Sequence, residues 1–191
     1  MSGKILLSLN CQNPDRSIVE TAKSIAKTFG LKIIPMHISS RQEDINATVA
    51  NNCEELKNEF KSENINADEP IIAKGDEIDE ITRISEENQV DLIVVPAVEG
   101  SGEKGELRKI NVKLIRRTEL PIWEVKPGSS AEVRKIVCPV ELSGHSDKAL
   151  KNAIALTCSF KAKLFFVNVY AHSATTSVFF NEDSENIRKE H

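Results

Sequence analysis

A glycine-rich loop follows a continuous apolar run near the middle of the chain. The run DLIVVP, residues 91–96, has the composition of a parallel strand that is buried on both faces. The loop AVEGSGEKGE follows at 97–106, and apolar residues at helical spacing begin directly after it. Backbone amides of such a loop, together with the N-terminus of the next helix, can hold a phosphate group. This loop is therefore the first candidate for a ligand site.

The charges of this loop act in opposite directions. Its glycines give it conformational freedom: Gly100, Gly102 and Gly105. Its cations can attract an anion: Lys104, Arg108 and Lys109. Its carboxylates oppose that attraction at similar range: Glu99, Glu103 and Glu106. Three interpretations stay open, namely a surface loop without a ligand, a phosphate site, and a peptide contact.

Other catalytic or metal-binding patterns are missing from the sequence. The cysteines at 11, 53, 138 and 158 form no CxxC pair, which predicts neither a zinc site nor a disulfide and favours a reducing compartment. The four histidines are equally scattered, and no metal site is expected. His145 lies beside Ser143 and Ser146 without a carboxylate spaced to orient it. The sequence predicts a protein that is not an enzyme, although weak ATP hydrolysis stays open.

The composition is that of a cytoplasmic globular protein. The chain has 191 residues, of which 40% are hydrophobic and 28% are charged, and its net charge is −4. A negative net charge argues against a nucleic acid or an anionic membrane as the main partner. No apolar run approaches the roughly 20 residues that a membrane span needs. We therefore expect a cytoplasmic location, no nucleic-acid partner and no membrane partner.

Strands and helices are predicted to alternate along the first two thirds of the chain. Five apolar runs read as strands, at 4–9, 31–38, 69–75, 90–95 and 120–125. Helical spacing fills the intervals, with Gly30 placed to end the first helix and Asp76 placed to cap the third. The alternation predicts an α/β fold, with an open parallel five-stranded sheet and helices on both faces. Ligands bind such sheets beyond the carboxyl ends of the strands, so the loops after Leu9 and Val95 are predicted to form the crevice.

The chain also contains an incomplete internal repeat. A shift of 131 residues places KILLSLN on KIVCPVE and LKIIPMHI on AKLFFVNV, and the polar segment KPGSSAEV separates the two copies. The predicted organisation is a complete module at 1–127, a linker at 128–133 and a partial β-α-β module at 134–191. Such a piece cannot cover both faces of its strands. Docking on the first module, self-association and truncation are all open, and we expect a homodimer that associates through the strand at 120–125 and the linker.

Two stretches resemble the universal stress protein family. One is VRKIVCPVELSGHSDKALKNAIALTCSFKAKLFFVNVY, and the other is GDEIDEITRISEENQVDLIVVP, which leads through the glycine loop to LPIWEVKPG. The resemblance implies an adenine nucleotide alpha hydrolase-like fold, in a tandem arrangement with one complete module and an incomplete second.

Nucleotide-binding members of that family share a pattern from which this chain departs. Their fourth strand ends in glycine, a second glycine follows three positions later, and a Gly-Ser or Gly-Thr pair opens the last helix. Here Pro96 takes the first position and lacks a backbone donor, Glu99 or Gly100 takes the second, and Arg108–Lys109 takes the pair. Asn10 replaces the aspartate that usually ends the first strand.

The second module keeps more of its opening motif. Pro139 and Glu141 stand at the end of its first strand, and Ser146 is placed to cap the following helix. The phosphate loop of this module would lie further along the sequence than His191. The candidate ligand-binding residues of the whole chain are Asn10, Pro96, Gly100, Gly102, Gly105, Lys109, Pro139 and Glu141.

Three functions follow from the resemblance. The first is a non-catalytic, stress-associated regulatory or binding protein with a degraded nucleotide motif, which binds no cofactor and acts as a dimer or with a protein partner. The second is a universal stress protein that binds ATP or AMP. The third is a cytosolic regulatory module related to the domains that are fused to transporters.

Overall fold

The computed structural model describes residues 3–39, 47–97, 108–141 and 146–168, except for the side chains of 108–111. The chain divides into two compact units, Met1–Val133 and Arg134–His191. The boundaries of the linker, 128–133, stay a prediction. None of the helices in the described residues is long and apolar enough to cross a bilayer.

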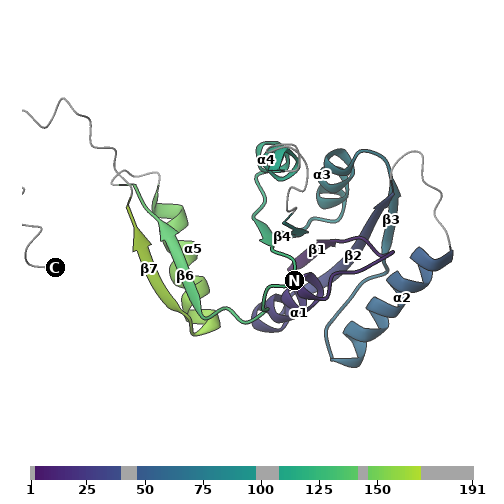
Figure 1. Ribbon diagram of the computed structural model, residues 1–191, viewed down its shortest axis with the longest axis horizontal. Helices are drawn as coiled ribbons and strands as arrows, with labels where there is room; N and C mark the ends of the chain where they lie inside the picture. The colour runs from purple at the N-terminus through teal and green to yellow at the C-terminus, as the bar shows by residue number, and fades with distance from the viewer. Residues whose placement is uncertain (1–2, 40–46, 98–107, 142–145, 169–191) are drawn as a thin grey trace, which may run out of the picture. The chain divides into compact units, whose positions relative to one another are not determined.

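The first unit is built on a five-stranded parallel sheet, in the order β3-β2-β1-β4-β5 (Figure 1). Its strands are β1 Lys4–Ser8, β2 Lys32–Ser39, β3 Ile71–Lys74, β4 Leu92–Pro96 and β5 Ile122–Val125. Its helices are α1 Arg16–Phe29, α2 Ala47–Ser62, α3 Glu77–Glu87 and α4 Arg108–Arg117. This arrangement confirms the predicted fold class. The strand order reverses beside β1, because β2 lies on one side of it and β4 on the other.

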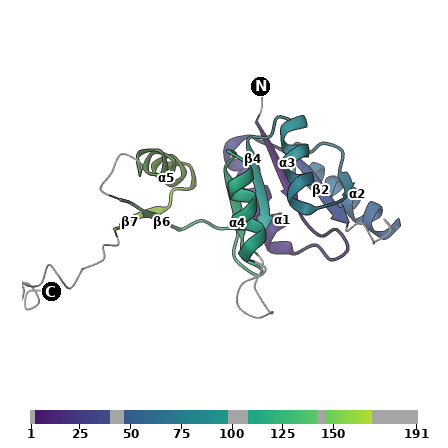
Figure 2. The ribbon, with the colours of Figure 1, turned by 90° about the horizontal axis from the view of Figure 1, so that it is seen from above.

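Helices cover both faces of this sheet. Helices α1 and α2 lie on one face and α3 and α4 on the other (Figures 1 and 2). The side chains under α3 and α4 form one core cluster, which includes Leu6, Ile34, Met36, Ile81, Ile93 and Leu114. The alternation of side chains along a strand sends neighbouring residues to opposite faces. The strand β1 is therefore buried on both of its faces, as its continuous apolar sequence predicts.

The predicted end of α1 and the predicted start of α3 are confirmed. Gly30 follows α1 with φ 65°, a left-handed conformation that glycine adopts without a steric cost, and its N–H donates to the Ala26 carbonyl. Asp76 precedes α3, and its carboxylate accepts hydrogen bonds from the N–H groups of Ile78 and Asp79. These caps satisfy backbone groups that the helices leave without internal partners.

An ion network joins α1 to α2. Lys23 is only 3% exposed, and its ammonium group contacts the carboxylates of Glu20, Glu59 and Glu63. The guanidinium of Arg16 also binds Glu59, at 2.6 Å. Hydrogen bonds from Arg16 and then Lys23 lower the pKa of Glu59 from its ordinary value of 4.5 to about 2. The folded state therefore favours the charged form of Glu59.

The network predicts acid sensitivity. A carboxyl group with a lowered folded-state pKa stabilises the protein above its unfolded-state pKa, and this contribution disappears as the pH falls from about 4.5 through about 2. We expect Glu59→Gln to lower the free energy of unfolding at neutral pH by about 1–2 kcal/mol, a modest amount because solvent screens a partly exposed pair. The difference from wild type should shrink in acid. Urea unfolding across this pH range measures it, with the exposed Glu55→Gln on the same helix as the control. Parallel pH curves for wild type and Glu59→Gln would contradict the assignment.

The second unit repeats the opening strand–helix–strand arrangement of the first. It consists of β6 Lys135–Pro139, α5 Asp147–Phe160 and β7 Lys163–Val167. Strands β6 and β7 pair in parallel with Lys135 opposite Lys163, as β1 and β2 pair with Lys4 opposite Lys32. A shift of 131 residues therefore relates the two registers as well as the two sequences.

The prediction that Ser146 caps α5 with its side chain is wrong. Ser146 occupies the capping position, but its hydroxyl makes no hydrogen bond to the first turn of the helix. It accepts the backbone N–H of Glu141 instead, at 2.7 Å. The hydroxyl thus ties the helix start back to the chain that leaves β6.

Corresponding sheet positions of the two units differ in burial. In the first unit Leu6, Ile34 and Met36 face α3 and α4 and are at most 1% exposed. Their counterparts in the second unit are 61%, 46% and 42% exposed, at Val137, Phe165 and Val167 respectively. The described residues of the second unit contain no counterpart of α3 or α4. The second unit thus repeats the apolar pattern of the strands, but its described residues include no helices that would bury this face.

This contrast predicts unequal effects of matched substitutions. Ile34→Ala should lower the free energy of unfolding of the first unit by about 2–4 kcal/mol, because it removes a buried side chain. Phe165→Ala, at the matching position, should change the stability of the second unit by less than about 1 kcal/mol. Urea unfolding measures both effects, with Trp123 fluorescence reporting on the first unit and circular dichroism on the whole chain. An equally large cost for Phe165→Ala would mean that other residues cover this face.

Candidate functional site

A pocket opens at the carboxyl ends of the central strands of the first unit. Its volume is about 370 Å³, and it is lined by Ser8, Leu9, Asn10, Gln12, His37, Ile38, Gly75, Glu77 and Pro96. These residues come from the ends of β1, β2 and β4, from the loops that follow β1 and β3, and, for Glu77, from the first position of α3. The pocket lies at the point where the strand order reverses, which is where open parallel sheets bind ligands.

The structure brings two of the eight candidate residues together here. Asn10 and Pro96 both line the pocket, at the ends of β1 and β4. Gly100, Gly102 and Gly105 lie outside the described residues. Lys109 lies in the first turn of α4, and its side chain is outside the described part of the structure. The remaining two, Pro139 and Glu141, belong to the second unit.

The wall beside Asn10 is a short loop that leads from β1 to α1. Leu9 continues the strand pairing, because its N–H donates to the Met36 carbonyl at 3.0 Å. The side-chain oxygen of Asn10 accepts the N–H of Gln12 at 2.9 Å and so closes a tight turn. Asn52 of α2 donates its side-chain N–H to the Cys11 carbonyl at 2.7 Å. The turn is therefore fixed to both the sheet and α2.

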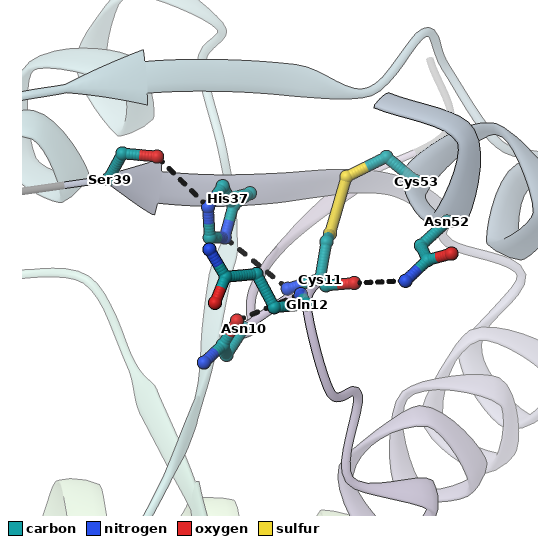
Figure 3. The surroundings of a disulfide bond; sticks show 7 residues. All are labelled: Asn10, Cys11, Gln12, His37, Ser39, Asn52 and Cys53. Atoms are coloured by element: carbon teal, nitrogen blue, oxygen red, sulfur yellow. Dashed lines mark hydrogen bonds between the residues drawn. A yellow bond between two sulfur atoms is a disulfide. The ribbon is translucent and has the colours of Figure 1, made fainter. Parts of the chain in front are cut away.

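His37 supports this loop from β2. Its ring is 4% exposed, and its Nδ1 accepts the backbone N–H of Cys11 at 3.3 Å (Figure 3). An acceptor at Nδ1 places the hydrogen of the neutral ring on Nε2, which lies 3.1 Å from Ser39 Oγ and donates to it. His37 is not among the site residues that the sequence predicts. The available signal was its position near the end of the strand that pairs with β1.

The Ser39–His37 pair is not arranged for nucleophilic catalysis. A serine nucleophile needs a histidine nitrogen that can accept its proton, and here Nε2 is the donor. Ser39 is also 1% exposed and does not line the pocket. The pair instead fixes the orientation of the imidazole ring, and the ring in turn holds the Cys11 amide.

A disulfide joins Cys11 of the loop to Cys53 of α2, with their Cα atoms 5.8 Å apart (Figure 3). The expectation that the sequence contains no disulfide is therefore wrong. The two cysteines lie 42 positions apart in the sequence, and the packing of α2 against β2 brings Cys53 next to the turn that follows β1. The free cysteines, Cys138 and Cys158, belong to the second unit.

The described part of the pocket lining is polar and carries no cation. Its hydrogen-bonding side chains are amides, an imidazole, a hydroxyl and the carboxylate of Glu77, and none of the described lining residues is lysine or arginine. Glu77 stands at the rim, where desolvation and then the neighbouring charge of Asp76 raise the pKa of its carboxyl group. The described walls therefore suit a polar ligand of low negative charge better than a polyphosphate.

Pro96 removes a donor from the wall that faces β1. Backbone groups of successive strand residues point to opposite sides. Ile93 donates to the Pro121 carbonyl and Ala97 donates to the Val125 carbonyl, both on the β5 side of β4. An N–H at position 96 would therefore point to the β1 side, where the pocket lies. Proline has no such N–H.

No family model and no curated protein matches this sequence. Solved structures do match it. The putative universal stress protein from Pseudomonas aeruginosa UCBPP-PA14 aligns with a TM-score of 0.68 and 16% identity, over 98% of this chain and 69% of that one. A universal stress protein from Archaeoglobus fulgidus DSM 4304 aligns with a TM-score of 0.64 and 15% identity, over 99% and 74%.

A shorter match covers only part of this chain. A universal stress protein in complex with cAMP aligns over 66% of this chain and 98% of its own, with a TM-score of 0.52 and 20% identity. The two longer proteins match the whole of this chain, its second strand–helix–strand unit included. This chain therefore has the universal stress protein fold, an adenine nucleotide alpha hydrolase-like parallel sheet, followed by a second small β6–β7 sheet.

Proposed function

We propose that this protein is a non-catalytic regulatory protein of the universal stress protein type. In this proposal, the pocket of the first unit binds a nucleoside or a cyclic mononucleotide and holds a polyphosphate chain only weakly. The observation that carries the proposal is a pocket at the strand-order reversal whose described lining offers polar groups and no cation.

The size and polarity of the pocket support this ligand class. Its volume of about 370 Å³ lies at the lower end of the range for small-molecule sites, which is roughly 300–1,000 Å³. Asn10, Gln12 and His37 bring amide and imidazole groups to one side of it, and Ile38 brings apolar surface. A purine ring with an attached ribose combines apolar faces with polar edges and suits such a lining. The cAMP complex of a structurally similar protein supports the same class.

The phosphate end is where this chain and the family pattern differ. The three phosphate groups of a triphosphate carry several negative charges, and strong binding needs N–H donors or cations close to them. Pro96 supplies no N–H, and Glu77 adds a carboxylate to the rim. We therefore expect a ligand with one negative charge to bind more tightly than one with three or four.

The first test of this proposal compares ligands by calorimetry. We expect cAMP to bind at least about tenfold more tightly than ATP, a difference of about 1.4 kcal/mol. Gln12→Ala should weaken cAMP binding severalfold because it removes an amide from the wall, whereas Asn58→Ala on the exposed surface of α2 should not. Tighter binding of ATP would favour the ATP-binding alternative, and the absence of binding by cAMP, adenosine and ATP would contradict the proposal.

A second test concerns the missing donor at position 96. We expect Pro96→Ala and Pro96→Gly to strengthen ATP binding severalfold, because both restore a backbone N–H on the β1 side of β4. Agreement between the two variants would separate the restored N–H from the added flexibility of glycine. If neither variant changes the dissociation constant for ATP in calorimetry, Pro96 is not what limits phosphate binding.

Self-association stays a prediction. β5 is the last strand in the sheet order, and α4, which precedes it, exposes the apolar side chains of Val112 and Ile115 by 44% and 57%. These features support the proposed homodimer. Native mass spectrometry counts the subunits, and a single subunit at micromolar concentration would exclude a stable dimer.

A further inference from the structure

We propose that the Cys11–Cys53 disulfide is a reversible switch, through which a dithiol reductant controls the loop that forms one wall of the pocket. The inference concerns the regulation of the pocket described above. It rests on the proposed function only for the identity of the ligand, because the movement of the loop can be measured without one.

The disulfide joins a well-anchored element to a short irregular one. Cys53 lies within α2, which packs on the sheet and is tied to α1 by the ion network around Lys23. Cys11 lies in the turn after β1, between Asn10 and Gln12, which both line the pocket (Figure 3). A change at the sulfur of Cys11 is therefore transmitted directly to two residues of the pocket wall.

Reduction follows ordinary thiol–disulfide exchange. A thiolate of the dithiol attacks one sulfur, the Cys11–Cys53 bond breaks and a mixed disulfide forms. The second thiol of the reductant then displaces the protein sulfur. In total, two electrons and two protons pass to the protein, which gains two thiols, and the reductant leaves as its own disulfide. Oxidation by a dithiol–disulfide protein reverses each step.

The two thiols need more room than the bond they replace. Bonded sulfurs lie about 2.05 Å apart, and unbonded heavy atoms settle at van der Waals separation, roughly 1.5 Å further apart. Cys11 and Cys53 are 0% and 1% exposed, and close-packed interiors leave little free volume for such a shift. Because α2 is anchored, most of the displacement falls on Cys11.

The contacts of Cys11 convert that displacement into a change in the pocket. The hydrogen bond from its backbone N–H to His37 Nδ1 already has a nitrogen–nitrogen distance of 3.3 Å, so a small movement of Cys11 breaks it. Asn52 holds the Cys11 carbonyl from the same helix that carries Cys53. We therefore expect reduction to release the turn from its fixed position between β2 and α2.

Ligand and reductant should oppose each other. Both sulfurs are buried, so the reductant reaches them only when the loop opens. A ligand that contacts Asn10 and Gln12 holds the loop closed, so it should slow reduction and also bind the oxidised protein more tightly than the reduced protein. Linkage then requires that the bound ligand shift the thiol–disulfide equilibrium toward the disulfide by the same factor.

Amide hydrogen exchange on the full chain tests the switch. The protein carries Cys138→Ser and Cys158→Ser, so that Cys11 and Cys53 are its only cysteines, and is compared in oxidised form and after dithiothreitol. We expect protection of the Cys11 and Gln12 amides to fall at least about tenfold on reduction, while the amides of β4 keep theirs. Unchanged protection of the loop would overturn the proposal, as would failure of the two thiols to form a bond under a disulfide oxidant.

Two controls separate a switch from a general loss of stability. Cys53→Ser should show the exchange pattern of the reduced protein under both conditions, and wild type with its second-unit cysteines intact should respond as the double variant does. Calorimetry with cAMP completes the test. Looser binding after reduction supports the switch. If hydrogen exchange in the loop changes on reduction but cAMP binds neither form, the switch is supported and the proposed ligand is wrong. If cAMP binds both forms equally and exchange in the loop is unchanged, the switch is wrong and the proposed ligand is supported.

Discussion

The position of β1 between β2 and β4 is the constraint on which the first unit depends. Its central side chains, Ile5, Leu6 and Leu7, are all 0% exposed, so both faces of the strand are committed to the core. A slip of one residue would exchange the two faces and leave the packing of every helix mismatched. Because its neighbours connect in opposite directions, the carboxyl end of β1 opens the crevice in which the pocket lies.

The side chains at that end of β1 hold the wall of the pocket in place. His37 uses Nδ1 to hold a backbone amide and Nε2 to donate to a buried hydroxyl, so both nitrogens serve to build the wall. The loop after β1 is also fixed by the hydrogen bond from Leu9 to β2, by the side-chain amide of Asn52 in α2 and by the Cys11–Cys53 disulfide. A wall that is held at so many points presents its polar groups in a set geometry, which lowers the entropic cost of binding a small ligand.

The second unit shows how far burial depends on neighbours. Its strands pair in the register of β1 and β2, and its apolar positions recur at the same spacing. The equivalent of Ile34 is nevertheless 46% exposed, at Phe165. A strand of this kind gains its hydrophobic stabilisation only when a helix or a second sheet removes its face from water. Among the described residues, α5 packs on one face of the β6–β7 pair, where Phe166 is still 54% exposed, and the opposite face carries the exposed side chains of Val137, Phe165 and Val167.

Local patterns in the sequence determined the elements and their order. Each of these patterns depends on residues that are close together in the sequence: strand-length apolar runs, helical spacing, Gly30 after α1 and Asp76 before α3. The predictions made from them were confirmed for that reason. The rule for parallel sheets then led from the order of elements to the end of β1, where Asn10 and Pro96 line the pocket. These inferences needed no distant contact.

Contacts between distant residues were decided only by the tertiary structure. Cys11 and Cys53 carry no spacing signal, and their sulfurs meet because α2 packs beside the turn that follows β1. His37 is one of four histidines that are scattered along the sequence, and only the position of β2 beside β1 brings its ring to the backbone N–H of Cys11. Even at short range, Ser146 has the sequence position of a cap, but its hydroxyl accepts the N–H of Glu141 and not an N–H of the first turn of α5. Sequence periodicity reports which face of an element is apolar, whereas the partner of an individual polar or sulfur atom depends on how the elements pack.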